Sequence, residues 1–418
     1  MVTATSPHIM RQTNAVGVLQ AIRRCGPITR ADVARETGLS KPTVNAIVGE
    51  LVARGYALEG EASGPGRRLR PGPQANVLTF NAGAGYVVGF DLGISRVRAG
   101  LADLDGTILE TAEHSFGAAP PLLPAFVTLL ADLASGLAAR AGLSDGDIWA
   151  AGLGLPGFLD RREGTIRLAP GFESWQDLPF RTLLERTFSR RFGCSIVAGG
   201  RVQFAMLAEQ RHGGARGLED AVFVHLGKGI GLGLLVRGEI FEGAEGFAGE
   251  VGSVPCDSDE VPPAGVGAFE WMAGGRAFAR LARQAAESGA SPALARLAAG
   301  NPAALEAPAV FAAAAGGDAA ARAIIETLSD RIARGLAGVC CILNPAKLII
   351  GAGLSRAGDD FIAGLARRIA ALVPFPLVVE RTGLVDRTSV LGAVEQALRI
   401  VESERFFLFA AAERELAR

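Results

Sequence analysis

The sequence predicts an α/β protein in which an N-terminal winged helix-turn-helix precedes a larger body made of two related halves. Three observations support this prediction. Charge is distributed unevenly along the 418 residues, two short helical patterns flank a glycine near the N-terminus, and apolar strand patterns ending in glycine loops recur through the rest of the chain.

Composition excludes several classes of protein. No uncharged apolar stretch approaches the roughly 18–20 residues of a membrane span, and the start of the chain lacks the regions of a signal peptide. The five cysteines are scattered and none lies in a Cys-x-x-Cys arrangement, which argues against a disulfide framework and against structural zinc. We therefore expect a cytoplasmic protein with no membrane partner and no bound metal.

The overall net charge of −1 conceals an asymmetry. Residues 1–75 carry ten basic and five acidic groups, a net of +5, whereas the remainder of the chain has a net of −6. A basic module on a larger acidic body is typical of a nucleic-acid-binding head joined to a separate sensor or enzyme. A chance distribution of charge would give the same numbers. The local sequence pattern therefore has to distinguish a nucleic-acid-binding module from chance.

That pattern favours a helix-turn-helix. A helical periodicity over residues 14–24 is followed by a second helix beginning after Thr29, whose side chain can cap it. Gly38 permits a tight turn, and Ser40 can cap a third helix that tolerates Pro42 in its first turn. The later helix of such a pair enters the DNA major groove by its N-terminal residues.

A basic hairpin is expected to follow as the wing. Strand-like residues 57–61 and 75–81 flank the segment SGPGRRLRPG, whose arginines would meet phosphates or a minor groove. An ordinary helical hairpin is the simpler interpretation of the helices alone, but caps, turn, wing and charge together favour DNA binding. The residues expected to serve DNA binding are Thr29, Arg30, Ser40, Lys41, Pro42, Thr43, Asn45, Arg67, Arg68 and Arg70.

The body begins with three predicted strands, at residues 86–93, 95–106 and 107–115, and then alternates helices with strands. A second unit starts at 221–243, and a long helix is expected at 319–343. Three glycine loops follow apolar strands, and glycine lets backbone N–H groups approach a phosphate closely. The residues of these loops are Asp91, Gly93, Ser95, Gly227, Lys228, Gly229, Gly351 and Gly353.

Over nearly its full length the chain resembles the ROK family of sugar-responsive repressors and sugar kinases. The motifs are DLGIS, LPGFLD, LGKGIGLG, AGEVG and LNPAKLIIGAG, and the segment from GPITRADVARETGLS to GPGRRLRP resembles the repressor branch. The resemblance implies a two-lobed actin-like ATPase fold. It implies a winged helix at 1–80, a first lobe at 81–200 with 385–418 packing back onto it, and a second lobe at 201–384 for ligand sensing and dimerisation.

Departures from the family pattern argue against catalysis. Counting back from Glu209 places Gly200 and Arg201 where family kinases have an Asn-Asp pair, and an arginine cannot accept the proton of a sugar hydroxyl. Ser253 replaces the histidine that serves the sugar and the zinc, and the aligned segment 261–270 has none of the zinc cysteines. We therefore expect no kinase activity and no cofactor.

The family's sugar-contacting glutamates are retained. We expect a ligand at Glu250 and Glu270, with Arg201 and Ser253 beside them, although both glutamates could equally be helix-cap or surface carboxylates. Arg201 and Lys228 would add positive charge, so an anionic sugar phosphate or sugar acid is an alternative ligand. A cleft that drifted without use is a further alternative. His225 is interpreted as a core side chain, and the remaining histidines, His8, His114 and His212, as having no partner.

Together these patterns predict a DNA-binding transcriptional regulator that acts as a repressor without enzymatic activity. It is expected to bind double-stranded operator DNA as a homodimer or homotetramer and to respond to a sugar or sugar-phosphate effector. Two alternatives remain open at this point. One is an ATP-dependent sugar kinase with a fused DNA-binding head, and the other is a DNA-binding protein that senses no ligand.

Overall fold

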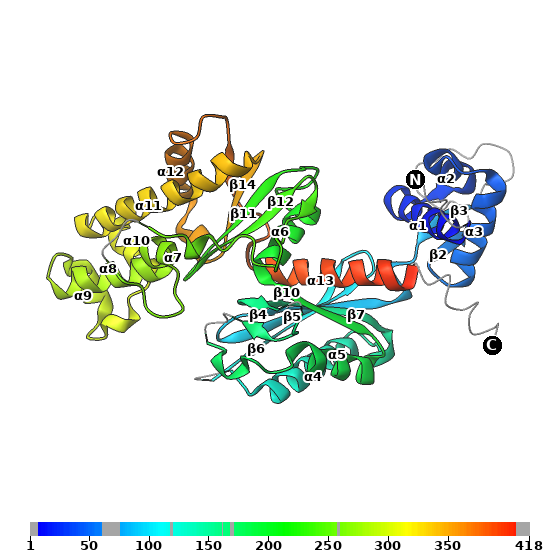
Figure 1. Ribbon diagram of the computed structural model, residues 1–418, viewed down its shortest axis with the longest axis horizontal. Helices are drawn as coiled ribbons and strands as arrows, with labels where there is room; N and C mark the ends of the chain where they lie inside the picture. Colours follow the sequence, from blue (N-terminus) through cyan, green and yellow to red (C-terminus); the bar gives the residue numbers. More distant parts are fainter. Residues whose placement is uncertain are drawn as a thin grey trace.

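A winged-helix module and two lobes make up the computed structural model, which describes residues 7–60, 76–117, 120–160, 162–167, 171–256 and 260–406. The module lies at one end, and each lobe is built around a five-stranded sheet (Figure 1). The predicted α/β class, with an N-terminal winged helix before a two-lobed body, is confirmed.

The winged-helix module contains three helices and a small antiparallel sheet. Thr29 and Ser40 cap the second and third helices as predicted, and Gly38 ends the second in the left-handed conformation at φ 69°. The tip of the predicted wing, residues 61–75, lies outside the described residues. The elements are α1 (Pro7–Cys25), β1 (Ile28–Thr29), α2 (Arg30–Thr37), α3 (Lys41–Ala53), β2 (Ala57–Gly60) and β3 (Val77–Phe80), with sheet order β1-β3-β2.

The first lobe has the sheet order β10-β7-β4-β5-β6. Phe90 and Leu153 on one face pack with helices α4 and α5, while the C-terminal helix α13 covers the opposite face. The elements are β4 (Tyr86–Leu92), β5 (Arg96–Asp103), β6 (Ile108–Ser115), α4 (Leu123–Arg140), β7 (Ile148–Leu155), β8 (Phe158–Leu159), β9 (Ile166–Arg167), α5 (Phe180–Phe192), β10 (Ser195–Gly200) and α13 (Thr388–Val401).

The second lobe repeats this topology, with the sheet order β13-β12-β11-β14-β15. In each lobe the first three strands pair antiparallel and the last two add in parallel, which confirms the prediction of two related halves. The elements are β11 (Ala221–Leu226), β12 (Ile230–Val236), β13 (Glu239–Ile240), α7 (Ala268–Ala273), α8 (Gly275–Glu287), α9 (Pro292–Ala298), α10 (Ala307–Ala315), α11 (Ala319–Leu343), β14 (Lys347–Gly351), α12 (Asp359–Ala370) and β15 (Val378–Arg381).

Two helices occupy the junction of the lobes. Helix α6 (Arg201–His212) packs against α13, and it contacts β7 of the first sheet and β11 and β12 of the second. The end of α13 points toward the winged helix (Figure 1). It continues into the short helical turn η8 (Glu402–Phe406), where Phe406 shares a hydrophobic cluster with Leu51 of α3. The body and the winged helix therefore share one core along α13.

One helix among the described residues, α4, has the length and apolar composition to cross a membrane. Its apolar side chains Phe126, Val127, Leu130 and Leu137 are buried against the sheet and α5. This is the packing of a core helix in a globular domain.

Candidate functional site

The recognition helix α3 presents a polar leading end. Ser40 accepts a hydrogen bond from the backbone N–H of Thr43 at 3.4 Å, and the two hydroxyl oxygens lie 2.7 Å apart. Lys41, Pro42 and Asn45 are exposed. They remain outside because the apolar side of the helix is buried in the module core, so the first turn is free to meet a groove. The core-facing residues are Val44, Ile47, Val48 and Leu51.

Arg30 takes a structural position beside this helix. Its guanidinium donates to both carboxylate oxygens of Glu59 on β2, from Nε at 2.8 Å and from Nη2 at 2.7 Å. Its Nη1 also reaches Oδ1 of Asn45 at 3.4 Å. Hydrogen bonds from Arg30 are the first cause of a lowered pKa at Glu59. Arg30 therefore joins the start of α2 to the wing strand and to Asn45.

The acidic side chains of the module are all engaged within its described part. Each of the four pairs with at least one arginine of the same module, which leaves positive charge over at the recognition helix. Lys41 forms no ion pair in the described part of the chain. Three further arginines expected at the wing, Arg67, Arg68 and Arg70, lie outside it. The pairs are Asp32 with Arg35, Glu36 with Arg24, Glu50 with Arg11 and Arg54, and Glu59 with Arg30.

A cavity of about 400 Å³ lies between the lobes, and all four expected ligand residues are in its wall. Arg201 comes from the start of α6, and Ser253 from the helical turn η4 (Val251–Ser253) that Glu250 precedes. Glu270 comes from α7. Gln203, Arg276 and His225, which sequence reasoning did not assign to the site, also line this cavity. Only tertiary structure brings them there, since no local motif marks them.

Arg201 is held by the first glycine loop. Its Nη2 donates to Oδ2 of Asp91 at 3.1 Å, and the Asp91 side chain is only 5% exposed. The remaining Asp91 oxygen and the Arg201 Nε are buried without a hydrogen-bond partner among the described residues. A second cation at Asp91 would meet the charge of Arg201, so this loop does not fit a metal-bound nucleotide.

The pKa values of both glutamates in the cavity wall are raised. Enclosure by the cavity wall, and secondly the negative charge of Glu270, raise the pKa of Glu250 to about 7, although solvent reaches its carboxylate through the cavity. Burial also raises the pKa of Glu270, and this is opposed by Arg276, whose Nε lies 3.3 Å from its Oε1. Carboxylate oxygens in such a wall can accept hydrogen bonds from ligand hydroxyl groups.

The other two glycine loops meet at a second cavity of about 660 Å³. Gly227, Lys228 and Gly353 line it, and Lys228 also faces the first cavity together with Gly229. The Lys228 amine is already paired with Glu306 at 2.8 Å. Four loop residues lie in neither wall: Ser95 is exposed, Gly93 is half-buried, and Asp91 and Gly351 are buried.

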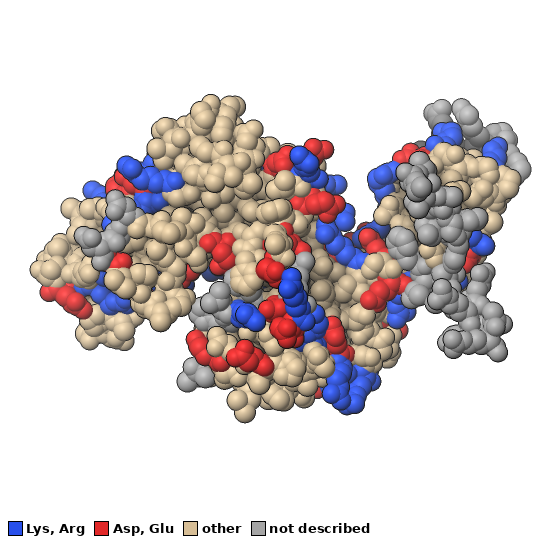
Figure 2. Space-filling model, viewed as in Figure 1, with Lys and Arg blue, Asp and Glu red and all other residues tan. Residues whose placement is uncertain are grey.

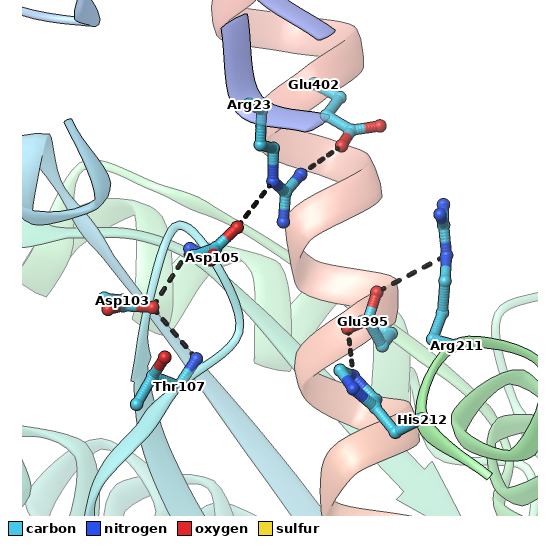
Figure 3. A network of polar contacts seen from close by, with 8 residues as sticks. All are labelled: Arg23, Asp103, Asp105, Thr107, Arg211, His212, Glu395 and Glu402. Carbon is cyan, nitrogen blue, oxygen red and sulfur yellow. Dashed lines mark hydrogen bonds and ion pairs between the residues drawn. The ribbon is translucent and has the colours of Figure 1, made fainter. Parts of the chain in front are cut away.

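His225 is enclosed within β11 as predicted, and it also lies in the wall of the cavity; burial, followed by the charge of Arg201, lowers its pKa to about 3. The prediction for His212 is wrong. His212 has a partner, because its Nε2 lies 2.6 Å from Oε1 of Glu395 on α13 (Figure 3). This contact could not be recognised from spacing, since it depends on how α6 crosses α13. Over the described residues, no cluster of three or more His, Cys, Asp or Glu could hold a metal ion.

Charge on the body differs from that on the module. Figure 2 shows basic and acidic side chains interspersed over both lobes on the face in view. Such a mixed surface does not attract nucleic acid through a broad field of one sign. On this face the lobes therefore lack the positive surplus that the recognition helix carries.

Two family models match the chain. The ROK family model matches residues 87–399, and a MarR family model matches residues 12–69. The first covers the two-lobed body, and the second covers most of the winged-helix module.

Two curated relatives differ in how much of this chain they cover. A putative xylose repressor of Caldicellulosiruptor sp. (strain Rt8B.4) is 28% identical and covers 93% of this chain and 96% of its own. A glucokinase of Thermotoga maritima is 29% identical and covers 95% of its own length but only 73% of this chain. The repressor thus matches head and body together.

Among solved structures, a ROK family transcriptional regulator described as a homologue of the E. coli MLC protein superposes with a TM-score of 0.75 at 21% identity. The match covers 96% of this chain and all of that one, so the same fold extends over both molecules. With the family model spanning most of the sequence and this fold spanning nearly all of it, the chain belongs to the ROK family.

Proposed function

We propose that this protein is a transcriptional repressor that binds double-stranded operator DNA through its winged helix and responds to a sugar or sugar-derived ligand held between its lobes. The observation that carries the proposal is the exposed end of α3, where Lys41 and Asn45 face outward from a module whose described acidic side chains are all paired. Arg67, Arg68 and Arg70 would add phosphate contacts from the wing.

The body has no place for phosphoryl transfer. Arg201 occupies the position at which family kinases have the proton-accepting aspartate, and it is bound to Asp91. A permanently protonated guanidinium cannot serve as a general base. We therefore assign the body a sensing role without kinase activity.

The cavity favours a neutral ligand with several hydroxyl groups. Arg201, Lys228 and Arg276 each pair with a carboxylate already, so a phosphate would have to displace one of them. Glu250 has no cationic partner among the described residues and can accept hydrogen bonds from hydroxyl groups. D-xylose is the first probe to test, because relatives of this chain are named xylose repressors.

Residues 1–80 would form the DNA-binding domain, 81–200 with 385–418 the first lobe, and 201–384 the second lobe with the dimer contact. A cytoplasmic homodimer or homotetramer would match a two-fold operator. Closure of the lobes around a ligand would change the spacing of the two heads and so lower operator affinity.

The proposal is tested by selecting preferred duplexes from a random DNA library with the full-length protein. We expect an enriched two-fold sequence bound with a Kd of about 10⁻⁸ M or tighter at physiological salt. Fluorescence anisotropy would then follow that duplex during titration with D-xylose, D-glucose and glucose 6-phosphate. A fall in affinity of about tenfold or more with a neutral sugar is expected.

Two results would contradict the proposal. A library without any enriched sequence would refute operator binding, and an affinity unchanged by every sugar would refute the sensing role. Coupled measurement of ADP release with the same sugars checks the remaining point, because turnover that disappears on replacing Glu250 or Glu270 would restore the kinase alternative.

A further inference from the structure

Helices α6 and α13 connect the interlobe cavity with the winged helix through a continuous set of contacts. Building on the proposed function, we propose that these two helices form one rigid link through which occupancy of the cavity controls the winged helix, with Arg201 at its input and Arg23 at its output. Glu395 on α13 and Glu402 just beyond it are positioning residues, since neither lies in the cavity wall or in the recognition helix.

The input end lies where both lobes hold α6. Arg201, the first residue of α6, is bonded to Asp91 at the end of β4 in the first lobe. The same helix packs closely on the second lobe: a Cβ added at Gly233 of β12 would lie 2.6 Å from the carbonyl oxygen of Val202. Since α6 is held by both lobes, their closure must shift it relative to at least one of them.

Helices α6 and α13 pack so closely that one cannot move along the other without a clash. A Cβ added at Gly392 of α13 would lie 1.7 Å from the carbonyl oxygen of Phe204 on α6, so the backbones touch. Glu395, buried to 8% exposure, binds His212 at 2.6 Å and Arg211 at 3.7 Å (Figure 3). A displacement of α6 is therefore passed to α13.

The output end reaches the winged helix. Glu402, just beyond α13, accepts a hydrogen bond from Nη1 of Arg23 on α1 at 3.0 Å (Figure 3). The Nε of Arg23 donates to Asp105 at the β5–β6 turn, also at 3.0 Å. Next to this pair, the rings of Phe406 and Tyr56 meet edge to face at 5.2 Å. Arg23 thus holds α1 between the end of the link and the first lobe.

Arg201 is the residue through which a ligand would act on the link. A ligand hydroxyl group that accepts from the Arg201 guanidinium competes with Asp91 for the same donor. Coupling along the link requires that loss of the Arg201–Asp91 contact alters DNA binding through Arg23.

A double-mutant cycle on the full-length protein tests this without a ligand. Asp91→Asn weakens the input contact, and Arg23→Gln removes the output contact. The Kd for the selected duplex is measured by anisotropy at one salt concentration. We expect Asp91→Asn to change the Kd at least fivefold in the wild-type background but less than twofold in the Arg23→Gln background.

Arg11→Gln is the matched control, because it removes the same charge from the same helix while its partner, Glu50, lies within the module. The Asp91→Asn effect should persist there. Equal effects in the Arg11→Gln and Arg23→Gln backgrounds would overturn the proposal, as would a folded Asp91→Asn protein with unaltered affinity. Arg201→Lys replaces Asp91→Asn if circular dichroism shows that the latter is unfolded. A wild-type protein that selects no duplex would instead refute the proposed function.

Discussion

The winged helix and the interlobe cavity both concentrate charged side chains, yet they leave opposite groups without a partner. In the described part of the module every acidic side chain pairs with an arginine, and Lys41 is left over. In the cavity wall each of the three cations pairs with a carboxylate, and Glu250 is left over. The unpaired Lys41 on the module can bind phosphate, and the unpaired Glu250 in the cavity can accept hydrogen bonds from hydroxyl groups.

The largest effect is expected where the module would read bases. Asn45→Ala removes a side chain that can form a bidentate contact with adenine, and we expect it to cost about 1–3 kcal/mol on the selected duplex. On a scrambled duplex the cost should be small. Lys41→Ala, as the comparison variant, should weaken both duplexes similarly and lower the salt slope by about one. Anisotropy at several salt concentrations distinguishes the two variants. Equal losses of affinity for the selected and the scrambled duplex with Asn45→Ala would contradict base reading.

A smaller effect is expected from releasing a paired arginine. Glu59→Gln frees Arg30 beside α3, so binding to scrambled DNA should tighten severalfold and its salt slope should steepen by about one. The pair is partly exposed, which limits the loss of unfolding free energy to about 1 kcal/mol. Glu36→Gln frees Arg24 on α1 instead, and it should tighten binding less. If Glu59→Gln left the salt slope unchanged, internal pairing would not set the cationic surplus of the module.

Local features of this fold could be predicted from sequence because their signals lie close together in the chain. Thr29, Gly38 and Ser40 specify caps and a turn within a dozen residues, and the structure contains them where expected. The repeated order of apolar strands in the sequence likewise predicted two related halves. These elements depend on neighbours and periodicity, so no tertiary knowledge was needed.

The charge pairing could not be predicted, because it joins distant positions. Arg201 and Asp91 are 110 residues apart, and His212 and Glu395 are 183 apart. From the sequence, Arg201 and Lys228 suggest an anionic ligand. Their bonds to Asp91 and Glu306 weaken that interpretation, since each cation already has its counter-charge. Four wall residues could still be named, because the family motifs mark them individually.

The pKa of Glu250, raised from 4.5 to about 7, predicts a pH effect on stability. Between these values the folded protein holds a proton that the unfolded chain releases, so the group lowers stability increasingly as pH rises, with the full penalty above pH 7. Glu250→Gln removes the penalty, and the Tm of the variant relative to wild type should rise from pH 5 to pH 8. Because water reaches the carboxylate, we expect less than about 1 kcal/mol. Glu287→Gln, on the surface of α8, serves as the control, and an identical pH trend in both variants would contradict the assignment.

Lys228 should give the smallest effect, although its place in a phosphate loop makes it the most suggestive cation of the body. Its pair with Glu306 is exposed on both sides, and such pairs contribute about 0–0.5 kcal/mol. Lys228→Met should therefore leave the Tm nearly unchanged and should not alter the response of the DNA complex to a neutral sugar. Arg276→Met, which breaks a more enclosed pair with Glu270, should diminish that response by disturbing a wall carboxylate. A response to glucose 6-phosphate that depends on Lys228 would reverse the comparison, because it would mean that the cavity, like the winged helix, uses a cation to recruit phosphate.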